Sequence, residues 1–135
     1  MSPAEIAIAE VDDLDVASRS MRVHATSRTL ARAVPLRDWS IETMTRRANE
    51  VGTGRLVFDG DASSGRASVT AVLRRVLRRA GLERDPLITL SSVPAVAARR
   101  AYEETGHVED AARRLGIRSL DRAAHLIALD WSAGP

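Results

Sequence analysis

The chain has 135 residues, of which 44% are hydrophobic and 28% are charged, a composition that indicates a globular rather than a disordered chain. It lacks cysteine, which excludes disulfides and thiolate chemistry, and no apolar run approaches the roughly 20 residues of a membrane span. All 20 basic residues are arginines, but the formal net charge is only +2, so charge alone is weak evidence for a nucleic-acid partner. We expect one cytoplasmic domain over residues 1–135, without a signal peptide.

The N-terminal third predicts a short helix followed by a β-hairpin. Ser2 can cap the helix, Pro3 suits its first position, and Glu5 completes a capping box. The run DDLD at 12–15 should end this segment. Alternating apolar residues then predict strands over 19–25 and 31–36, joined by a loop at 26–30.

The middle third predicts two helices separated by a loop. Asp38 is expected to cap a helix that runs through Asn49, and the run DGDASSG at 59–65 to be a loop. The next helix should end at Gly81 and carry an apolar stripe opposite a face of arginines. The stripe comprises Val69, Val72, Leu73, Val76, Leu77 and Ala80, and the arginines are Arg74, Arg75, Arg78 and Arg79. This arginine face is either an ordinary solvated surface or, with Arg66 near the helix start, a surface that follows phosphates.

The last third predicts three more helices, over 93–104, 107–115 and 119–131. The whole order is therefore a helix, a hairpin and five helices. We expect a mostly α fold of the α+β class, a helical bundle with a small antiparallel sheet.

Motifs for metal, cofactor or nucleophile chemistry are missing from the sequence. His24, His107 and His125 lie far apart without ligand spacing, so we expect no metal site and no cofactor. Phosphate-binding glycine loops and G-x-S-x-G motifs are also missing. The carboxylates of 10–15 fit a solvated turn better than an acid–base pair.

The run AARRLGIRSLDRA at 111–123 has the spacing of a helix-turn-helix. A recognition helix must present a polar face to base edges, but eight of the 13 residues in 119–131 are apolar. This helix should instead be buried or docked on a partner. Its candidate interface residues, for a protein partner or a homo-oligomer, are Leu126, Ile127, Leu129 and Trp131.

Several stretches, taken in order, resemble the catalytic domain of tyrosine recombinases, the phage-integrase family. Residues 1–36 are similar to its opening, which has a Leu-Arg-x-x-Glu-Leu helix, a W-x-D-I-D turn and a hairpin closing in R-x-V-P-L. RLVF at 55–58 and SVTAVLRRVLRRAGL at 68–82 resemble its next strand and helix, and 97–131 resembles its last third. The resemblance implies the fold of that domain without the family's N-terminal DNA-clamping domain.

The same resemblance implies that the catalytic side chains are not retained. The family uses a tyrosine nucleophile, two arginines, a lysine and histidines to cleave DNA. The matching positions here are Ser2 for the first arginine, about Ser27 for the lysine (with Arg28 the nearest cation), Ser91 through Pro94 for His-x-x-Arg, Ile117 for the second histidine and about Leu126 for the tyrosine. The only tyrosine, Tyr102, matches a scaffold position in the preceding helix. We therefore expect no enzymatic activity.

Two hypotheses of function follow. The first is a catalytically inactive integrase-like protein, derived from a phage or mobile element, that binds double-stranded DNA weakly and with strong salt dependence as a regulatory factor. Its candidate DNA contacts are Arg28, Arg32, Arg66, Arg74 and Arg118. The alternative is a protein-interaction or dimerisation module that uses the apolar C-terminal helix without binding DNA.

Overall fold

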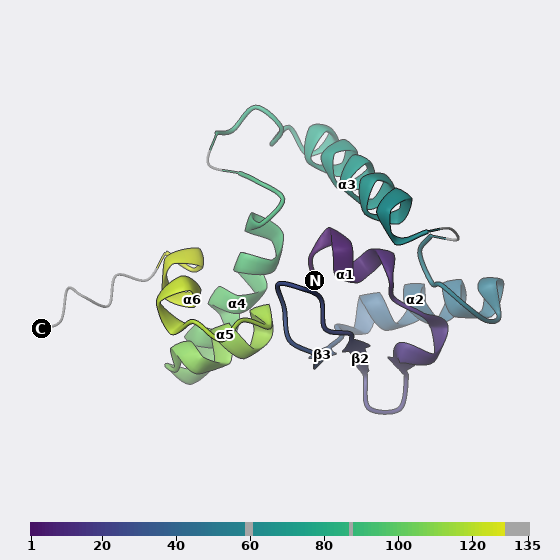
Figure 1. Ribbon diagram of the computed structural model, residues 1–135, viewed down its shortest axis with the longest axis horizontal. Coiled ribbons are helices and arrows are strands. Elements are labelled where there is room, and N and C mark those ends of the chain that lie inside the picture. Colours follow the sequence, from purple (N-terminus) through teal and green to yellow (C-terminus); the bar gives the residue numbers. More distant parts are fainter. Residues whose placement is uncertain (59–60, 87, 129–135) are drawn as a thin grey trace, which may run out of the picture.

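The computed structural model describes residues 1–58, 61–86 and 88–128, and Figure 1 shows them as an N-terminal part with a small sheet beside a C-terminal group of helices. The predicted fold class, mostly helical with a small antiparallel sheet, is confirmed. In chain order the elements are α1 (Pro3–Ala7), the 3-10 helix η1 (Val11–Asp13), β1 (Leu14–Asp15), β2 (Ser20–Val23), β3 (Arg32–Pro35), α2 (Asp38–Val51), α3 (Ala62–Arg79), α4 (Ser92–Thr105), α5 (Val108–Leu115) and α6 (Leu120–Leu126).

The sheet is antiparallel with the strand order β1-β2-β3. The predicted hairpin is confirmed as β2 and β3, with Met21 opposite Val34 and Val23 opposite Arg32. Met21 and Val23 are both 1% exposed, so the inner face of β2 belongs to the core. The two-residue strand β1 was not predicted, because it lies within the segment that we expected only to end the first helix.

The predicted capping box of α1 is present. The Ser2 hydroxyl accepts from the Glu5 backbone N–H at 3.4 Å, and the Glu5 carboxylate accepts from the Ser2 N–H at 2.6 Å. α1 is short and packs against α3, while the core beneath it comprises Ala9, Met21 and Leu56. The start of the chain is therefore fixed in space next to α3.

Helix α2 begins one residue earlier than its predicted cap implies. Arg37 is the residue before the helix, and Asp38 is already its first helical residue, where an acidic side chain interacts favourably with the helix dipole. The helix continues to Val51, and Gly52 ends it with a φ of 76°. The prediction of Asp38 as the cap was thus wrong by one position.

Helix α3 begins inside the segment predicted as a loop. Asp61 caps it by accepting from the backbone N–H groups of Ser63 at 2.9 Å and Ser64 at 3.0 Å. A Cβ at Gly65 would lie 3.1 Å from the Ala7 Cβ, so this glycine allows α1 and α3 to approach closely. The loop was predicted from small polar residues, but Asp61 is the cap and Ser63 and Ser64 lie in the first turn of the helix; residues 59–60 lie outside the described residues.

The apolar stripe of α3 is only partly covered. Val69, level with α1, is 5% exposed, whereas Val72 and Val76 further along are 53% and 55% exposed. Among the described residues, Val69 is therefore the one member of the predicted stripe that is buried, while Leu73 and Leu77 are partly exposed.

The helices α4, α5 and α6 pack around a second core, whose buried members are Ala98, Val108, Ala111, Ala112, Leu115, Ala123, Ala124 and Ile127. Gly116 ends α5 in the left-handed conformation with a φ of 72°, and the Ser119 side chain caps α6. The helix predicted over 119–131 ends at Leu126, because the chain turns at Ile127 and Ala128. The remainder of that prediction lies outside the described residues.

Candidate functional site

A groove of about 1090 Å³ lies between the N-terminal part and the C-terminal helices. One wall is α3, and another is formed by the segment that leads into α4 together with the turn between α5 and α6. The start of α1 and the hairpin loop at 26–29 complete the lining. Five segments of the chain thus meet at one hollow, which makes it the candidate functional site.

The lining of the groove is basic and rich in hydroxyl groups. Its charged residues are Arg28, Arg66, Arg74, Arg78, Arg122 and Glu83, so among the described residues five cations face one carboxylate. Its hydroxyl side chains are Ser2, Thr26, Ser27, Thr29, Thr70, Thr89 and Ser91. Guanidinium and hydroxyl groups are the side chains that proteins most often use to contact phosphate oxygens.

Helix α3 places its arginines on the groove by helical spacing. Arg66, Thr70 and Arg74 follow each other at intervals of four residues, and Arg78 continues the row. At 1.5 Å rise per residue, the row extends over roughly 18 Å from Arg66 to Arg78. Along this wall of the groove, Arg66 and Arg74 are eight residues apart, and Arg74 and Arg78 are four residues apart.

Most of these arginines have no carboxylate partner. Within the described ranges, Arg28, Arg66, Arg74 and Arg122 take part in none of the ion pairs. Arg78 differs, because its Nε and Nη2 donate to Glu83 at 2.8 and 2.9 Å. Four guanidinium groups at the groove are thus available to an external anion.

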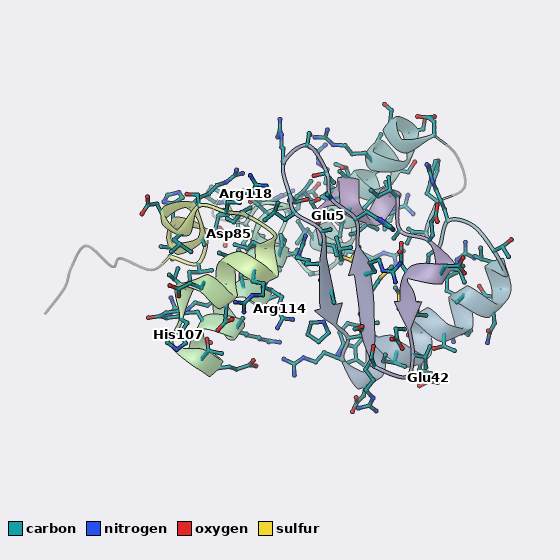
Figure 2. The ribbon with its side chains drawn as sticks, turned by 60° about the horizontal axis from the view of Figure 1, so that its bottom comes forward. Glu5, Glu42, Asp85, His107, Arg114 and Arg118 are labelled. Carbon is teal, nitrogen blue, oxygen red and sulfur yellow. The ribbon has the colours of Figure 1, made fainter. Side chains whose placement is uncertain are left out.

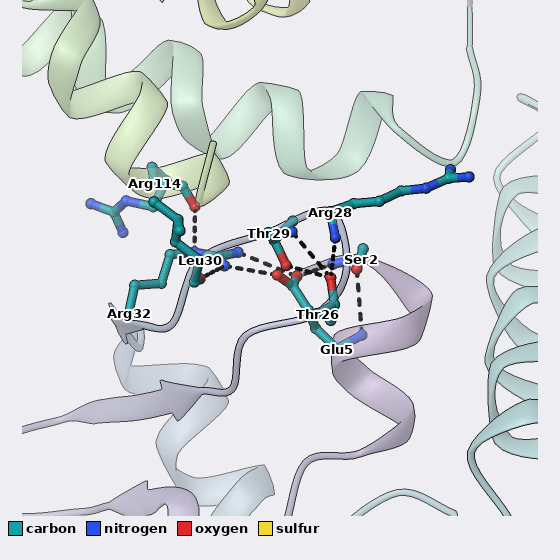
Figure 3. Close-up of polar contacts among 8 residues, drawn as sticks. All are labelled: Ser2, Glu5, Thr26, Arg28, Thr29, Leu30, Arg32 and Arg114. Atoms are coloured by element: carbon teal, nitrogen blue, oxygen red, sulfur yellow. Dashed lines mark hydrogen bonds and ion pairs between the residues drawn. The ribbon is translucent and has the colours of Figure 1, made fainter. Parts of the chain in front are cut away.

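Arg32, predicted as a DNA contact, is buried beneath the hairpin loop instead. Its side chain is 6% exposed and that of Glu5 is 1% exposed, and the two are joined at 2.7 and 3.2 Å (Figure 3). Arg32 also donates from Nε to the Arg114 carbonyl at 3.0 Å. Because these internal bonds occupy its guanidinium, Arg32 is not exposed to an external anion in this structure, unlike the contact that the sequence predicted.

The Glu5 carboxylate is held ionised by this network. Burial alone would raise the pKa of Glu5, but hydrogen bonds from Arg32, Thr29 and the Ser2 backbone outweigh it and lower the pKa to about 2. The same network holds the hairpin loop at the groove, since Thr26 and Thr29 share a hydrogen bond of 2.8 Å beside Glu5. Figure 3 shows the Arg28 side chain extended away from this cluster.

The hairpin is also tied to the turn after α5. The Leu30 N–H donates to the Gly116 carbonyl at 2.7 Å. A Cβ at Gly116 would lie 2.8 Å from the Arg32 Cζ, so only glycine allows the guanidinium to lie there. Gly116 and Arg32 thus fix the two sides of the groove relative to each other.

The remaining predicted contact residues lie elsewhere. Arg118 is exposed on the turn between α5 and α6 but does not line the groove (Figure 2). Among the interface candidates, Ile127 is 4% exposed and the partly buried Leu126 packs against the C-terminal core, so both residues contact the interior of the chain itself. Leu129 and Trp131 lie outside the described residues.

Comparison with solved structures identifies a relative of the fold. A crystal structure of XerA recombinase is similar to 97% of this chain with a TM-score of 0.75 at 15% sequence identity. The chain has a recombinase-like fold. It spans about half of that recombinase, covering 48% of its chain. Neither a protein-family model nor a curated protein sequence matches this chain.

The recombinase-like fold brings together most positions at which the sequence resemblance expects catalytic groups. Ser2, Ser27, Ser91, Pro94 and Ile117 all line the groove, although they are spread over more than a hundred residues of sequence. The position expected for the tyrosine, Leu126, does not line it. Tyr102 is half-buried in α4 against the C-terminal core, with the Arg99 guanidinium 5.8 Å from its ring centre.

Two groove arginines were not among the predicted DNA contacts. Arg78 belonged to the arginine face for which a surface that follows phosphates was one of two interpretations, and its four-residue spacing from Arg74 gave a signal that could have added it to those contacts. Arg122 had no such signal, because its position at the groove depends on how α6 packs in the folded chain.

Within 1–58, 61–86 and 88–128, no three His, Asp or Glu side chains group together in a way that could hold a metal ion. Over the same ranges no helix is both long enough and apolar enough to cross a membrane.

Proposed function

We propose that this chain binds double-stranded DNA in the basic groove without cleaving it, as a DNA-binding or regulatory factor of integrase-like origin. The observation that carries the proposal is the groove itself, where Arg28, Arg66, Arg74 and Arg122 project from three separate elements without ion-pair partners in the described part of the chain. Such unpaired guanidinium groups attract phosphates and release their counterions on contact.

The proposed lack of cleavage rests on chemistry rather than on fold. Serine, proline and isoleucine stand at the groove positions where the resemblance expects arginine, lysine and histidine, and neither lysine nor histidine is among the described residues that line it. The only tyrosine of the chain packs into the C-terminal core and is not one of the lining residues. A bound phosphodiester would therefore be held without the tyrosine nucleophile that the resemblance expects, and without a lysine or histidine among the described lining residues to activate a hydroxyl group.

The binding experiment compares the groove arginines with arginines elsewhere on the surface. We expect wild-type protein to shift the anisotropy of a short fluorescent duplex at about 50 mM salt, and Arg66→Ala/Arg74→Ala to weaken binding by about tenfold or more. The matched control is Arg22→Ala/Arg46→Ala, which removes the same charge from exposed residues of β2 and α2 that do not line the groove. Equal loss in both double variants would mean that the groove has no special part in binding.

The cleavage experiment uses a nicked duplex, on which an active recombinase would leave a covalent protein–DNA adduct. We expect no adduct on a denaturing gel at any protein concentration that saturates binding. An adduct that disappears in Tyr102→Phe would contradict the proposal, since it would show a functional nucleophile.

A regulatory protein of this kind would work in the cytoplasm on the DNA of its host or of a phage. Neighbouring genes that encode an active integrase or other phage functions would support that origin.

The alternative function, a protein-interaction module built on the C-terminal helix, has less support. Ile127 is buried and Leu126 packs against the core, so these two residues stabilise the chain rather than await a partner. Sedimentation at several protein concentrations tests the alternative, because a dimer that forms without DNA would revive it.

A further inference from the structure

Glu83 is the only carboxylate among the described residues that line the basic groove, and its position is set by the end of α3. The Gly81 N–H donates to the Arg78 carbonyl at 3.0 Å, and the Leu82 N–H donates back to the Leu77 carbonyl at 2.9 Å. Gly81 adopts a φ of 72°, which reverses the chain after the helix. This turn returns Glu83 to the side of Arg78, five residues before it.

The contact between the two side chains has the geometry of an arginine–phosphate contact. Both oxygens of Glu83 accept from the Arg78 guanidinium, at 2.8 Å from Nε and 2.9 Å from Nη2. A planar anion with two oxygens on the guanidinium fork occupies the donors that a phosphate would use. Arg78 is therefore the one cation on the α3 row that already holds an anion.

The pair is accessible to an external competitor. The Arg78 side chain is 68% exposed and that of Glu83 is 42% exposed, so neither is locked by packing. Hydrogen bonds and charge from Arg78, with a smaller contribution from Arg74, hold the pKa of Glu83 below its usual range, so the carboxylate stays ionised. An exposed pair of this kind can exchange its carboxylate for another anion at small cost.

We propose that Glu83 is a built-in competitor of the DNA phosphate for Arg78, which lowers the affinity of the groove for DNA until a phosphate displaces it. This inference rests on the proposed function, because it assigns an affinity-setting residue to the same groove. Displacement exchanges one carboxylate for one phosphate oxygen pair on the same guanidinium, and no covalent bond changes. Four groove arginines are then available to DNA phosphates at first contact, and Arg78 becomes available only after Glu83 has left its guanidinium.

The test is a double-mutant cycle on duplex DNA binding with wild type, Glu83→Gln, Arg78→Gln and the double variant. We expect Glu83→Gln to tighten binding by about two- to fivefold. DNA no longer has to break the exposed ion pair, and the free energy of such a pair corresponds to a change in affinity of that order. We also expect its plot of log affinity against log salt to become steeper by about 0.9, because phosphate binding to Arg78 then no longer frees a carboxylate that takes up a salt cation. When Glu83→Gln is added to the Arg78→Gln variant, the logarithm of the affinity should change by less than half as much as it does in wild type.

The matched control is Glu42→Gln, which removes an equal charge from an exposed carboxylate on α2, a helix that does not line the groove (Figure 2). Tighter binding by Glu83→Gln than by wild type, with Glu42→Gln unchanged, would support the inference. If wild type binds but Glu83→Gln behaves like Glu42→Gln, the inference is wrong and the proposed function stands. If neither wild type nor Glu83→Gln binds DNA at low salt, both are wrong.

Discussion

Replacing Gly116 by alanine should destabilise the protein far more than the same change at Gly106. Both glycines follow a helix in the left-handed conformation, with φ of 72° and 74°. That backbone costs an alanine roughly 1–2 kcal/mol at either position. At Gly106 nothing lies within 4 Å of the added Cβ, whereas at Gly116 the Cβ would lie 2.8 Å from the Arg32 Cζ and 3.1 Å from the Leu30 carbonyl oxygen.

The Arg32 guanidinium cannot easily move aside, because it is bonded to Glu5 and to the Arg114 carbonyl. Overpacking of this kind costs roughly 1–3 kcal/mol more. We therefore expect about 1–2 kcal/mol for Gly106→Ala and about 2–5 kcal/mol for Gly116→Ala, measured as free energies of unfolding in urea. Equal losses in the two variants would refute the close contact between Arg32 and the turn after α5.

Three further outcomes are expected for stability. Arg32→Met should lower the free energy of unfolding by about 3–5 kcal/mol, since it leaves the Glu5 carboxylate buried without its cation; Arg28→Met, at an exposed loop residue, should change it by under about 0.5 kcal/mol. Folding lowers the pKa of Glu5 to about 2, so its ionised carboxylate contributes about 3 kcal/mol to the free energy of unfolding above pH 4.5, and this contribution is lost as pH falls towards 2. Urea unfolding measured against pH should show this loss in wild type and not in Glu5→Gln. Asp61→Ala should cost about 1 kcal/mol and some helical circular dichroism, because its carboxylate caps α3; no change would mean that this helix does not begin there.

The sequence predicted those elements whose signals are local. The capping box of α1, the hairpin and the helices that became α4 and α5 depend on residues within a few positions of each other, and all are present. The start of α3 was missed because Asp61, its cap, was assigned to a loop of small polar residues. Local composition could not distinguish the two states there.

The site residues were harder to predict because burial depends on distant partners. Arg32 is buried only because Glu5, 27 positions earlier, provides a carboxylate beneath the hairpin. One signal was available, since Arg32 and Val34 alternate with the exposed Ala33 and so share the inner face of β3. Exposure of Val72 and Val76 likewise depends on how far α1 extends along α3, which periodicity does not reveal.

The resemblance added what local reasoning could not. It placed Ser2, Ser27, Ser91 and Ile117 at corresponding sites of a single catalytic centre, and the fold does bring these four residues to one groove. It did not predict the charges around them, because Arg78, Glu83 and Arg122 belong to this chain's own surface.

The salt dependence of duplex DNA binding tests the central claim most directly. With Arg28, Arg66, Arg74 and Arg122 unpaired at the groove, the plot of log affinity against log salt should have a slope of about −3.6, and about −1.8 for Arg66→Ala/Arg74→Ala. The Arg22→Ala/Arg46→Ala control should keep the wild-type slope. Absence of binding at about 50 mM salt, or a slope that the two groove substitutions leave unchanged, would contradict DNA binding by this groove.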